Sequence, residues 1–417
     1  MSSQERSVSL FFKILTPQDA KATFFSRWQG EPGPHEVLPL EAALGRVVAT
    51  DIVVPRNLPS FPKSTVDGYA VRAADTFGAS EGLPSYLTVI GEVQIGRAPA
   101  FRVASGEAAW IPTGGMLPEG ADAVVMVEHT EPLDERTVEV KRPVGPGENV
   151  IRPGEDFPEG AVAIDRGRKL TPQDIGLLAA LGITEVPVVV PPKVAILSTG
   201  DEIVPPHVEP GPAQTRDINT YTLGAMVREE GGLPVLYGII PDAYEPLLDA
   251  LRRAHEECDL ILVSGGSSVG PRDLVARAIH ALGEPGVLVH GVSMKPGKPT
   301  VLAVANGTPV VGLPGHPTTV MIVFHVFVRE ILWRLLGLRP RPRPPVIARM
   351  GRRIASAPGR EDYLRVALEE REGELWAIPL LGKSGLLSTM VKADGLVRIP
   401  LEREGLEVGD PVEVWLW

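Results

Sequence analysis

The segment SGGSSVGPRDLV, residues 264–275, spaces its glycines much as a phosphate-binding loop does. Gly265 and Gly270 match the glycines of the pattern G-x-x-x-x-G-K-[ST], but Pro271 stands where that pattern has its nucleotide-holding lysine. Backbone N–H groups and hydroxyls can still hold phosphates in such a loop. The alternative is a turn that only joins a strand to a helix.

The elements around this loop alternate between strands and helices. Four apolar runs are typical of strands, at 193–197, 235–240, 260–263 and 308–313, and three segments are typical of helices, at 219–230, 244–256 and 273–282. We read Asn219 as the residue that opens the first of these helices. The alternation predicts a parallel sheet with helices on both faces, and ligands of such sheets bind at the carboxyl ends of the strands. The loops at 198–202, 264–273 and 314–319 follow strand ends, so we expect them to converge.

The regions before and after these alternating strands and helices have a different sequence pattern. RPRPRPP, residues 339–345, predicts a stiff linker, and short apolar runs separated by glycines beyond it indicate a small β-rich domain. Residues 53–144 also indicate short strands and turns. TPQDIGLLAALG, residues 171–182, predicts a helix with Thr171 as its N-cap.

Composition narrows the functional classes. A chain of 417 residues predicts two to four domains, and a net charge of −11 argues against a general nucleic-acid surface. The single cysteine, Cys258, excludes an intrachain disulfide framework and a zinc–cysteine cluster, and it fits a reducing cytoplasm. The polar start of the chain gives no sign of a signal peptide.

The apolar segment at 320–336 is the one candidate for a membrane-spanning helix in the sequence. It contains His325, Arg329, Glu330 and Arg334. These side chains predict a buried core helix and no membrane association.

Six ordered segments carry a specific resemblance. They are LPSFPKSTVDGYAVRAADT (58–76), PTGGMLPEGADAVVMVE (112–128), ILSTGDEIV (196–204), SGGSSVGPRD (264–273), MKPGKPT (294–300) and GLPGHP (312–317). In this order they resemble the signature segments of the molybdopterin molybdenumtransferase family of the MoeA type, which also occurs as the E domain of gephyrin. GREDYLRV (359–366) and GKSGLLSTMVKADGLVRIP (382–400) resemble the last domain of that family.

The resemblance implies an α/β multidomain fold and an elongated homodimer. Its parts would be a split, partly helical domain at the dimer contact, a β-rich domain containing DGYA, a molybdopterin-binding domain with a doubly wound parallel sheet, and a C-terminal β-barrel. The corresponding residue ranges are 1–52 with 145–190, then 53–144, 191–338 and 339–417.

The resemblance also implies a reaction. Members bind adenylylated molybdopterin and cleave its pyrophosphate link in the presence of molybdate and Mg²⁺, and they release AMP and molybdenum cofactor. Because no γ-phosphate is transferred, a phosphate loop without its lysine would suffice. A molybdopterin adenylyltransferase and recipient molybdoenzymes are the implied protein partners.

Several residues match active-site positions of the family. The catalytic carboxylates would be Asp67, Glu202, Asp242 and Asp273, of which Glu202, Asp242 and Asp273 would hold Mg²⁺. The alternatives are a turn before Gly68 for Asp67, and helix capping or a solvated face for the others. Contacts to the pterin and its phosphates are implied for Thr113, Gly114, Ser198, Thr199, Gly200, Gly265, Gly266, Ser268, Gly270, Pro314, Gly315 and His316.

Molybdate is a tetrahedral dianion, so its pocket needs cations and hydroxyls. Lys295 and Lys298, which Pro296 and Gly297 keep out of a regular helix, are the natural pair, with simple solvation as the alternative. The resemblance adds four further residues to this pocket: Ser268, Thr319, Arg360 and Ser384.

His316 is the most consequential departure from the family pattern; Val66 and Pro271-Arg272 also replace commoner choices but only flank matched residues. His316 replaces the usual asparagine of G-L-P-G-N-P, and histidine is bulkier and titrates near neutral pH. A related molybdopterin adenylyltransferase, a non-catalytic scaffold or cofactor chaperone, and an insertase that prefers tungstate are the alternative functions.

Overall fold

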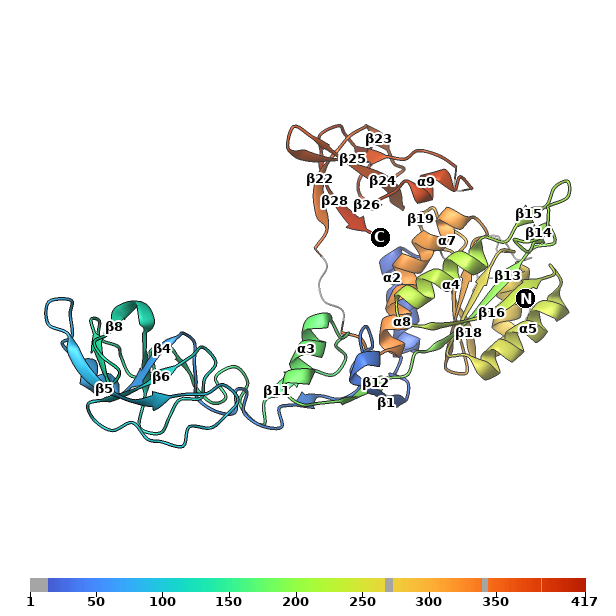
Figure 1. Ribbon diagram of the computed structural model, residues 1–417. Helices are drawn as coiled ribbons and strands as arrows, with labels where there is room; N and C mark the ends of the chain where they lie inside the picture. The colour runs from blue at the N-terminus through green and yellow to red at the C-terminus, as the bar shows by residue number, and fades with distance from the viewer. Residues whose placement is uncertain (1–13, 267–272, 340–343, 384) are drawn as a thin grey trace.

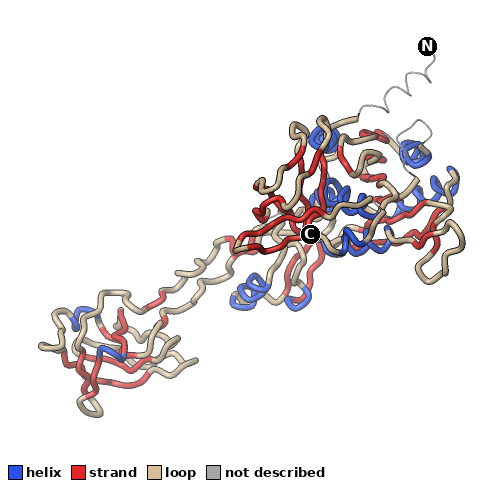
Figure 2. The backbone as a smooth tube through the Cα atoms, turned by 90° about the horizontal axis from the view of Figure 1, so that it is seen from above, coloured by secondary structure: helices blue, strands red, loops and turns tan. Residues whose placement is uncertain are grey.

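The computed structural model describes residues 14–266, 273–339, 344–383 and 385–417. The molecule is elongated. A β-rich domain lies at one end, an α/β domain and a C-terminal barrel lie at the other, and extended pairs of strands join them (Figures 1 and 2).

The distal β-rich domain is built on one six-stranded sheet of order β7-β4-β6-β5-β9-β8. The strands are β4 (Gly68–Val71), β5 (Ser85–Glu92), β6 (Glu107–Ile111), β7 (Ala123–Met126), β8 (Thr130–Pro132) and β9 (Thr137–Val140). Alternate side chains enter two separate apolar clusters: Tyr69 and Val71 of β4 enter one, and Ala70 enters the other.

Two-stranded ribbons connect this domain to the rest of the chain. The pairs are β1 (His35–Pro39) with β12 (Glu185–Val189), β2 (Ile52–Val53) with β11 (Val162–Ile164), and β3 (Lys63–Ser64) with β10 (Val150–Ile151). Helix α3 (Pro172–Ala180) packs beside them. Thr171 caps it in a capping box with Asp174, which confirms the predicted helix start.

The α/β domain is built on a six-stranded sheet of order β16-β13-β17-β21-β20-β18. Its strands are β13 (Lys193–Thr199), β16 (Leu233–Ile240), β17 (Leu260–Ser264), β18 (Pro285–His290), β20 (Val301–Ala305) and β21 (Thr308–Leu313). The four predicted strands are parallel, as expected. β20 runs antiparallel because Asn306 and Gly307, both with positive φ, close a tight hairpin into β21.

Helices cover both faces of this sheet, which confirms the predicted architecture. Val194 and Ile196 of β13 face a core that includes residues of α4 (Asn219–Glu229), α7 (Pro317–Val323) and α8 (Arg329–Leu335). Ala195 and Leu197 face a core that includes residues of α5 (Tyr244–Glu257) and α6 (Leu274–Leu282). Because neighbouring β13 residues point to opposite faces, one strand serves both cores.

The predicted core helix at 320–336 is present as α7, a π-helical turn (Phe324–Val328) and α8. Within it, His325 is largely buried against Trp417, and this burial lowers the pKa of His325 to about 4. No helix in the described part of the chain is long and apolar enough to cross a membrane.

Helix α2 (Pro17–Arg27) packs on the α/β domain, although it lies in the range 1–52 that we assigned to the split domain. Phe24 is buried in the same core as β18 and β20 residues, and the Trp28 indole N–H donates to Gly307 O at 3.0 Å. The apolar face of α2 accounts for this placement, because it is buried only against that core.

The C-terminal domain is a closed barrel. Strands β22 (Val346–Met350), β24 (Glu361–Arg371), β25 (Glu374–Pro379), β26 (Gly395–Ile399) and β28 (Pro411–Leu416) close because β24 pairs with both β25 and β26. β23 (Ile354–Ala355) pairs with β27 (Gly405–Leu406), and α9 (Ser388–Val391) precedes β26.

Two short strand pairings lie beside the site loops. β19 (Met294–Lys295), from the α/β domain, adds to the barrel as a parallel partner of β24. β14 (Ile203–Val204) and β15 (Thr215–Arg216) form a separate parallel pair after β13.

Candidate functional site

The loops after β13, β17 and β21 meet at the carboxyl edge of the sheet, as predicted. Gly265 N donates to Leu313 O at 3.2 Å, and a Cβ built on Gly315 would lie 3.5 Å from Gly265 Cα. β18 has the same direction as β21, because both run antiparallel to β20. The lysine loop at 291–300 that follows β18 therefore opens at the same edge.

Gly265 and Gly266 are required by close packing against the end of β13. Their φ angles are +100° and +56°, a region that favours glycine. A Cβ on Gly265 would overlap the Thr199 carbonyl oxygen, and one on Gly266 would lie 2.8 Å from Thr199 Oγ1 and 3.7 Å from Asp242 Oδ1. The loop thus brings bare backbone beside a hydroxyl and a carboxylate. The predicted Ser268 and Gly270 lie outside the described residues.

Thr199 has a buried hydroxyl at this meeting point. Its Oγ1 lies beside the Asp242 carboxylate but makes no well-formed hydrogen bond to any described residue. Buried hydroxyls are rarely left without a partner. Thr199 Oγ1 is therefore positioned to contact a group brought by a ligand.

Three carboxylates gather at the ends of β13 and β16. Asp242 N donates to Asp201 Oδ1 at 3.1 Å, and Glu202 follows Asp201 in the same turn. Burial, and then the negative charges of Asp201 and Glu202, raise the pKa of Asp242. A cation would relieve this repulsion, so the donor set fits Mg²⁺, an oxygen-seeking ion. Asp201 was missed, although it lies inside the quoted segment ILSTGDEIV.

The carboxylates are not arranged as a complete metal cage. Among the residues that the structure describes, no group of three His, Cys, Asp or Glu side chains converges closely enough to hold a metal ion. The charge of the cluster fits a cation, and the remaining oxygen ligands would have to come from water or substrate phosphate, as is usual for Mg²⁺.

Asp273 is buried at the start of α6. Its Oδ1 accepts a hydrogen bond from Ala276 N at 3.0 Å and so caps the helix, and its Oδ2 lies 3.3 Å from His290 Nε2. The capping role that we named as an alternative is thus present. The contact with His290, the last residue of β18, was not predicted, and no motif in the sequence signals it.

Asp67 lies in the distal β-rich domain, away from the other predicted carboxylates of the same chain (Figures 1 and 2). Thr113 N and Thr113 Oγ1 donate to Asp67 Oδ1 at 2.7 and 2.8 Å. These two hydrogen bonds, the backbone one first, lower the pKa of this exposed carboxyl. Gly114, with φ +81°, forms the turn beside it. The structure thus places the predicted residues Asp67, Thr113 and Gly114 side by side, a contact that the sequence did not predict.

The predicted molybdate residues lie where the α/β domain meets the barrel. Lys295 is exposed and pairs in register with Asp362 through the β19–β24 contact, and Lys298 is exposed in the same loop. The Arg360 guanidinium donates through Nε to Asp362 Oδ1 at 2.9 Å, so the guanidinium is partly neutralised. Thr319 is buried in the first turn of α7.

His316 begins α7 and is exposed, and its Cδ2 lies 3.9 Å from the Cβ position of Gly385. The barrel therefore reaches the 314–316 loop, in which Pro314 directly follows β21 and is buried. The predicted Ser384 lies outside the described residues.

Ser198 is buried beneath the loops. Its hydroxyl lies within hydrogen-bond distance of Asp217, Thr220 and Ser264. Ser198 therefore supports the site from below and does not line its opening.

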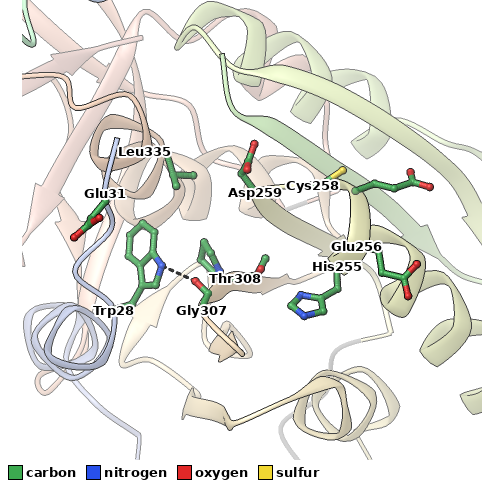
Figure 3. A pocket seen from close by; sticks show the side chains of 11 residues that line it. Trp28, Glu31, His255, Glu256, Cys258, Asp259, Gly307, Thr308 and Leu335 are labelled. Atoms are coloured by element: carbon green, nitrogen blue, oxygen red, sulfur yellow. Dashed lines mark hydrogen bonds between the residues drawn. The ribbon is translucent and has the colours of Figure 1, made fainter. Parts of the chain in front are cut away.

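Two cavities lie elsewhere. One of about 440 Å³ is at the amino edge of the sheet, between Trp28, His255, Cys258 and the Gly307 hairpin (Figure 3). The other, of about 1470 Å³, separates α8, the 165–172 segment and the barrel. Neither cavity includes the convergent loops.

Comparison with known proteins matches the domains just described. Residues 15–182 match the MoeA N-terminal region (domain I and II), residues 195–334 match a probable molybdopterin binding domain, and residues 347–417 match the MoeA C-terminal region (domain IV).

Similar proteins cover nearly the whole chain. A putative molybdopterin biosynthesis protein of Methanocaldococcus jannaschii is 36% identical, over 90% of this chain and 90% of its own. The molybdopterin molybdenumtransferase of Bacillus subtilis is 33% identical, over 92% and 90% respectively. The crystal structure of a MoeA protein from Pyrococcus horikoshii OT3 superposes with a TM-score of 0.85 at 33% identity, covering 97% of this chain and 100% of that one. With the same domains in the same order, the chain belongs to the MoeA family of molybdopterin molybdenumtransferases.

Proposed function

We propose that this protein is the molybdenum insertase of molybdenum cofactor biosynthesis. Adenylylated molybdopterin binds at the carboxyl edge of the α/β sheet, its pyrophosphate is hydrolysed, and molybdenum from molybdate is placed on the dithiolene. Water adds across one P–O–P bond, so AMP leaves and the second phosphate stays on the pterin. The observation that carries the proposal is the bare glycine backbone at Gly265 and Gly266, which meets Thr199 and the Asp242 carboxylate.

The phosphates would be held mainly by backbone groups. The positive-φ glycines open the loop so that N–H groups can approach an anion, and Thr199 Oγ1 offers a buried hydroxyl beside the Asp242 carboxylate. Such contacts bind phosphate without a lysine, in agreement with Pro271 in the loop.

Asp201, Glu202 and Asp242 would hold Mg²⁺ against these phosphates. The bound ion would neutralise the charge that develops during hydrolysis. The carboxylates themselves would fix where the cation sits, and burial together with their mutual repulsion raises the pKa of Asp242. Asp273 would act from the start of α6, where its carboxylate is held by Ala276 N and faces His290.

The oxyanion would bind beside the barrel. Lys295 and Lys298 provide two exposed ammonium groups on one loop, and the β19–β24 pairing brings them next to Arg360. Cations on a short, anchored loop suit a tetrahedral dianion.

The complete site would require a homodimer, with Asp67 reaching the α/β domain of a second copy. The distance of the β-rich domain from the carboxylate cluster in one chain supports this arrangement (Figure 1). The proposed location is the cytoplasm, which the single cysteine supports.

The deciding experiment measures AMP release from adenylylated molybdopterin with Mg²⁺, with and without molybdate. An insertase releases AMP in a molybdate-dependent manner. An adenylyltransferase would instead form the adenylylated pterin from molybdopterin and ATP, and a scaffold would bind the pterin without releasing AMP. Replacing molybdate with tungstate tests the choice of oxyanion. Binding without AMP release would refute the insertase assignment.

A further inference from the structure

Residues 215–220 contact the loops after β13 and β21 directly, and they reach the end of β17 through Ser198. The backbone of this segment binds the chain just after β13, next to Asp201. Thr215 N donates to Glu202 O at 2.9 Å, and Asp217 N donates to Val204 O at 2.8 Å. These bonds continue the β14–β15 pairing. The position of Glu202 is thus fixed from this segment.

Asp217 joins the ends of two strands. It is 7% exposed, and its Oδ1 accepts from Ser198 Oγ and from Thr220 N, both at 3.1 Å. Ser198 Oγ also lies 2.9 Å from Thr220 Oγ1 and 3.2 Å from Ser264 Oγ. One buried carboxylate therefore connects the ends of β13 and β17 to the start of α4. The connected residues Ser198 and Ser264 directly precede Thr199 and Gly265.

Asn219 holds the third loop. It is the first residue of α4, as predicted, but its side chain does not cap the helix: Asn219 Nδ2 donates to Gly315 O at 2.8 Å. Asn219 Oδ1 is buried and has no hydrogen-bond partner among the described residues. Since Gly315 lies against Gly265, this bond sets the distance between the two glycine loops.

We propose that Asp217 and Asn219 are positioning residues for the pterin-binding cleft. What the cleft binds rests on the proposed function, but the positioning itself rests on these contacts. Asp217 acts through Ser198 and Ser264, and Asn219 acts through Gly315. Buried hydrogen bonds to a charged carboxylate are stronger than neutral ones, and displacing a binding group by about 1 Å can cost about a hundredfold in rate.

Asn219→Asp tests the second contact with almost no change of shape. A carboxylate cannot donate to Gly315 O, so we expect the Kd for molybdopterin to rise about tenfold, the effect of one lost hydrogen bond. Asn149→Asp is the matched control, because Asn149 Nδ2 likewise donates to a carbonyl, Val124 O at 2.9 Å, outside the α/β domain. An unchanged Kd in Asn219→Asp, or an equal rise in the control, would overturn the role of Asn219.

Asp217 is tested with a pair of variants. Asp217→Asn keeps the acceptor Oδ1 and should retain kcat and KM for AMP release within about twofold, whereas Asp217→Ala should raise KM and lower kcat by about tenfold or more. Loss of AMP release in folded Asp217→Asn would show that the charge itself is needed, and would overturn the positioning role. A change in folded fraction alone, with KM unchanged in Asp217→Ala, would do so too.

These measurements also separate this inference from the proposed function. If the wild-type protein binds molybdopterin but releases no AMP, the insertase assignment fails, while the molybdopterin Kd of each variant still decides the positioning role. Should Asp217→Ala not fold, Asn219→Asp and Asp217→Asn carry the test, because both keep the size of the native side chain.

Discussion

Asp201, Glu202 and Asp242 lie together at one edge of the sheet, where burial and then the charges of the two neighbours raise the pKa of Asp242. Glu202 and Asp242 could be predicted as site carboxylates, because they match active-site positions of the family. The sequence could not show the hydrogen bond from Asp242 N to Asp201, because that contact joins the ends of two strands 41 residues apart. Likewise, His290 had no motif, and it meets Asp273 only because β18 ends beside the start of α6.

At the residue scale, we predict that Asp201→Asn lowers the pKa of Asp242, since a like charge is removed. A carboxyl whose pKa is raised in the folded state favours folding below its ordinary pKa, and this contribution is lost as pH rises through the folded value. The variant should therefore lose less stability over that pH range. Carboxyl ¹³C NMR titration without added metal measures the pKa directly. Glu256→Gln, at the opposite edge of the sheet, should leave the titration unchanged; an unaltered pKa in Asp201→Asn would contradict the cluster.

Asp273→Asn separates catalysis from helix capping. Asparagine is an equally good N-cap, so we expect the melting temperature to stay close to that of the wild type. Molybdopterin binding should survive, whereas AMP release should fall by about a hundredfold or more, because the charge acts on the transition state. Differential scanning fluorimetry and single-turnover AMP release provide the two readings. Normal turnover would leave Asp273 as a capping residue only.

At the scale of elements, the predicted strands of the α/β domain and the three loops after them were correct, because periodicity and strand-end position determine both. Two features lay beyond that reasoning. Pattern alone does not give strand direction, so β20 became visible as an antiparallel hairpin only in the structure. Asn219 begins α4 as its residue type predicts, but residue type could not show that its side chain binds Gly315 O in the loop after β21.

The glycine loop gives a matched pair of variants. Gly265→Ala and Gly307→Ala both force alanine into a positive φ, which costs about 1 kcal/mol or more. Only Gly265→Ala also overlaps the Thr199 carbonyl, since the Cβ position of Gly307 is open. We expect both variants to lose some thermal stability, and only Gly265→Ala to lose molybdopterin binding by tenfold or more. Thermal denaturation and binding titration compare them, and equal binding in both would remove the loop from the site.

The lysine loop gives a second prediction at this scale. Lys295→Ala and Lys298→Ala each remove a cation, and we expect the molybdate concentration for half-maximal AMP release to rise about tenfold per lysine. Pterin affinity measured without molybdate should change far less. Lys193→Ala, an exposed lysine at the opposite edge of the sheet, is the control. If pterin binding is lost while the molybdate dependence is unchanged, the lysines hold the phosphate and the oxyanion site lies elsewhere.

At the scale of the molecule, the position of Asp67 means that a complete site would need residues from two copies of the chain. In a homodimer whose sites combine the β-rich domain of one copy with the α/β domain of the other, two inactive variants can complement each other. We predict that Asp67→Asn and Asp242→Asn, mixed after dissociation and reassociation, regain roughly a quarter of wild-type activity, because half of random dimers are mixed and each mixed dimer has one intact site. Sedimentation of the mixture checks the dimer. Activity that stays at the level of the separate variants would place the complete site within one chain.

The packing of α2 on β18 and β20 has a consequence for how this chain is made. About 260 residues separate Arg27 from Pro285, so the ribosome completes the docking surface of α2 roughly 15–50 s after it has synthesised α2. During that interval Phe24 and Trp28 have no native core to enter. The nascent chain thus carries an exposed aromatic segment through most of its own synthesis, a state that holding chaperones recognise by its apolar surface.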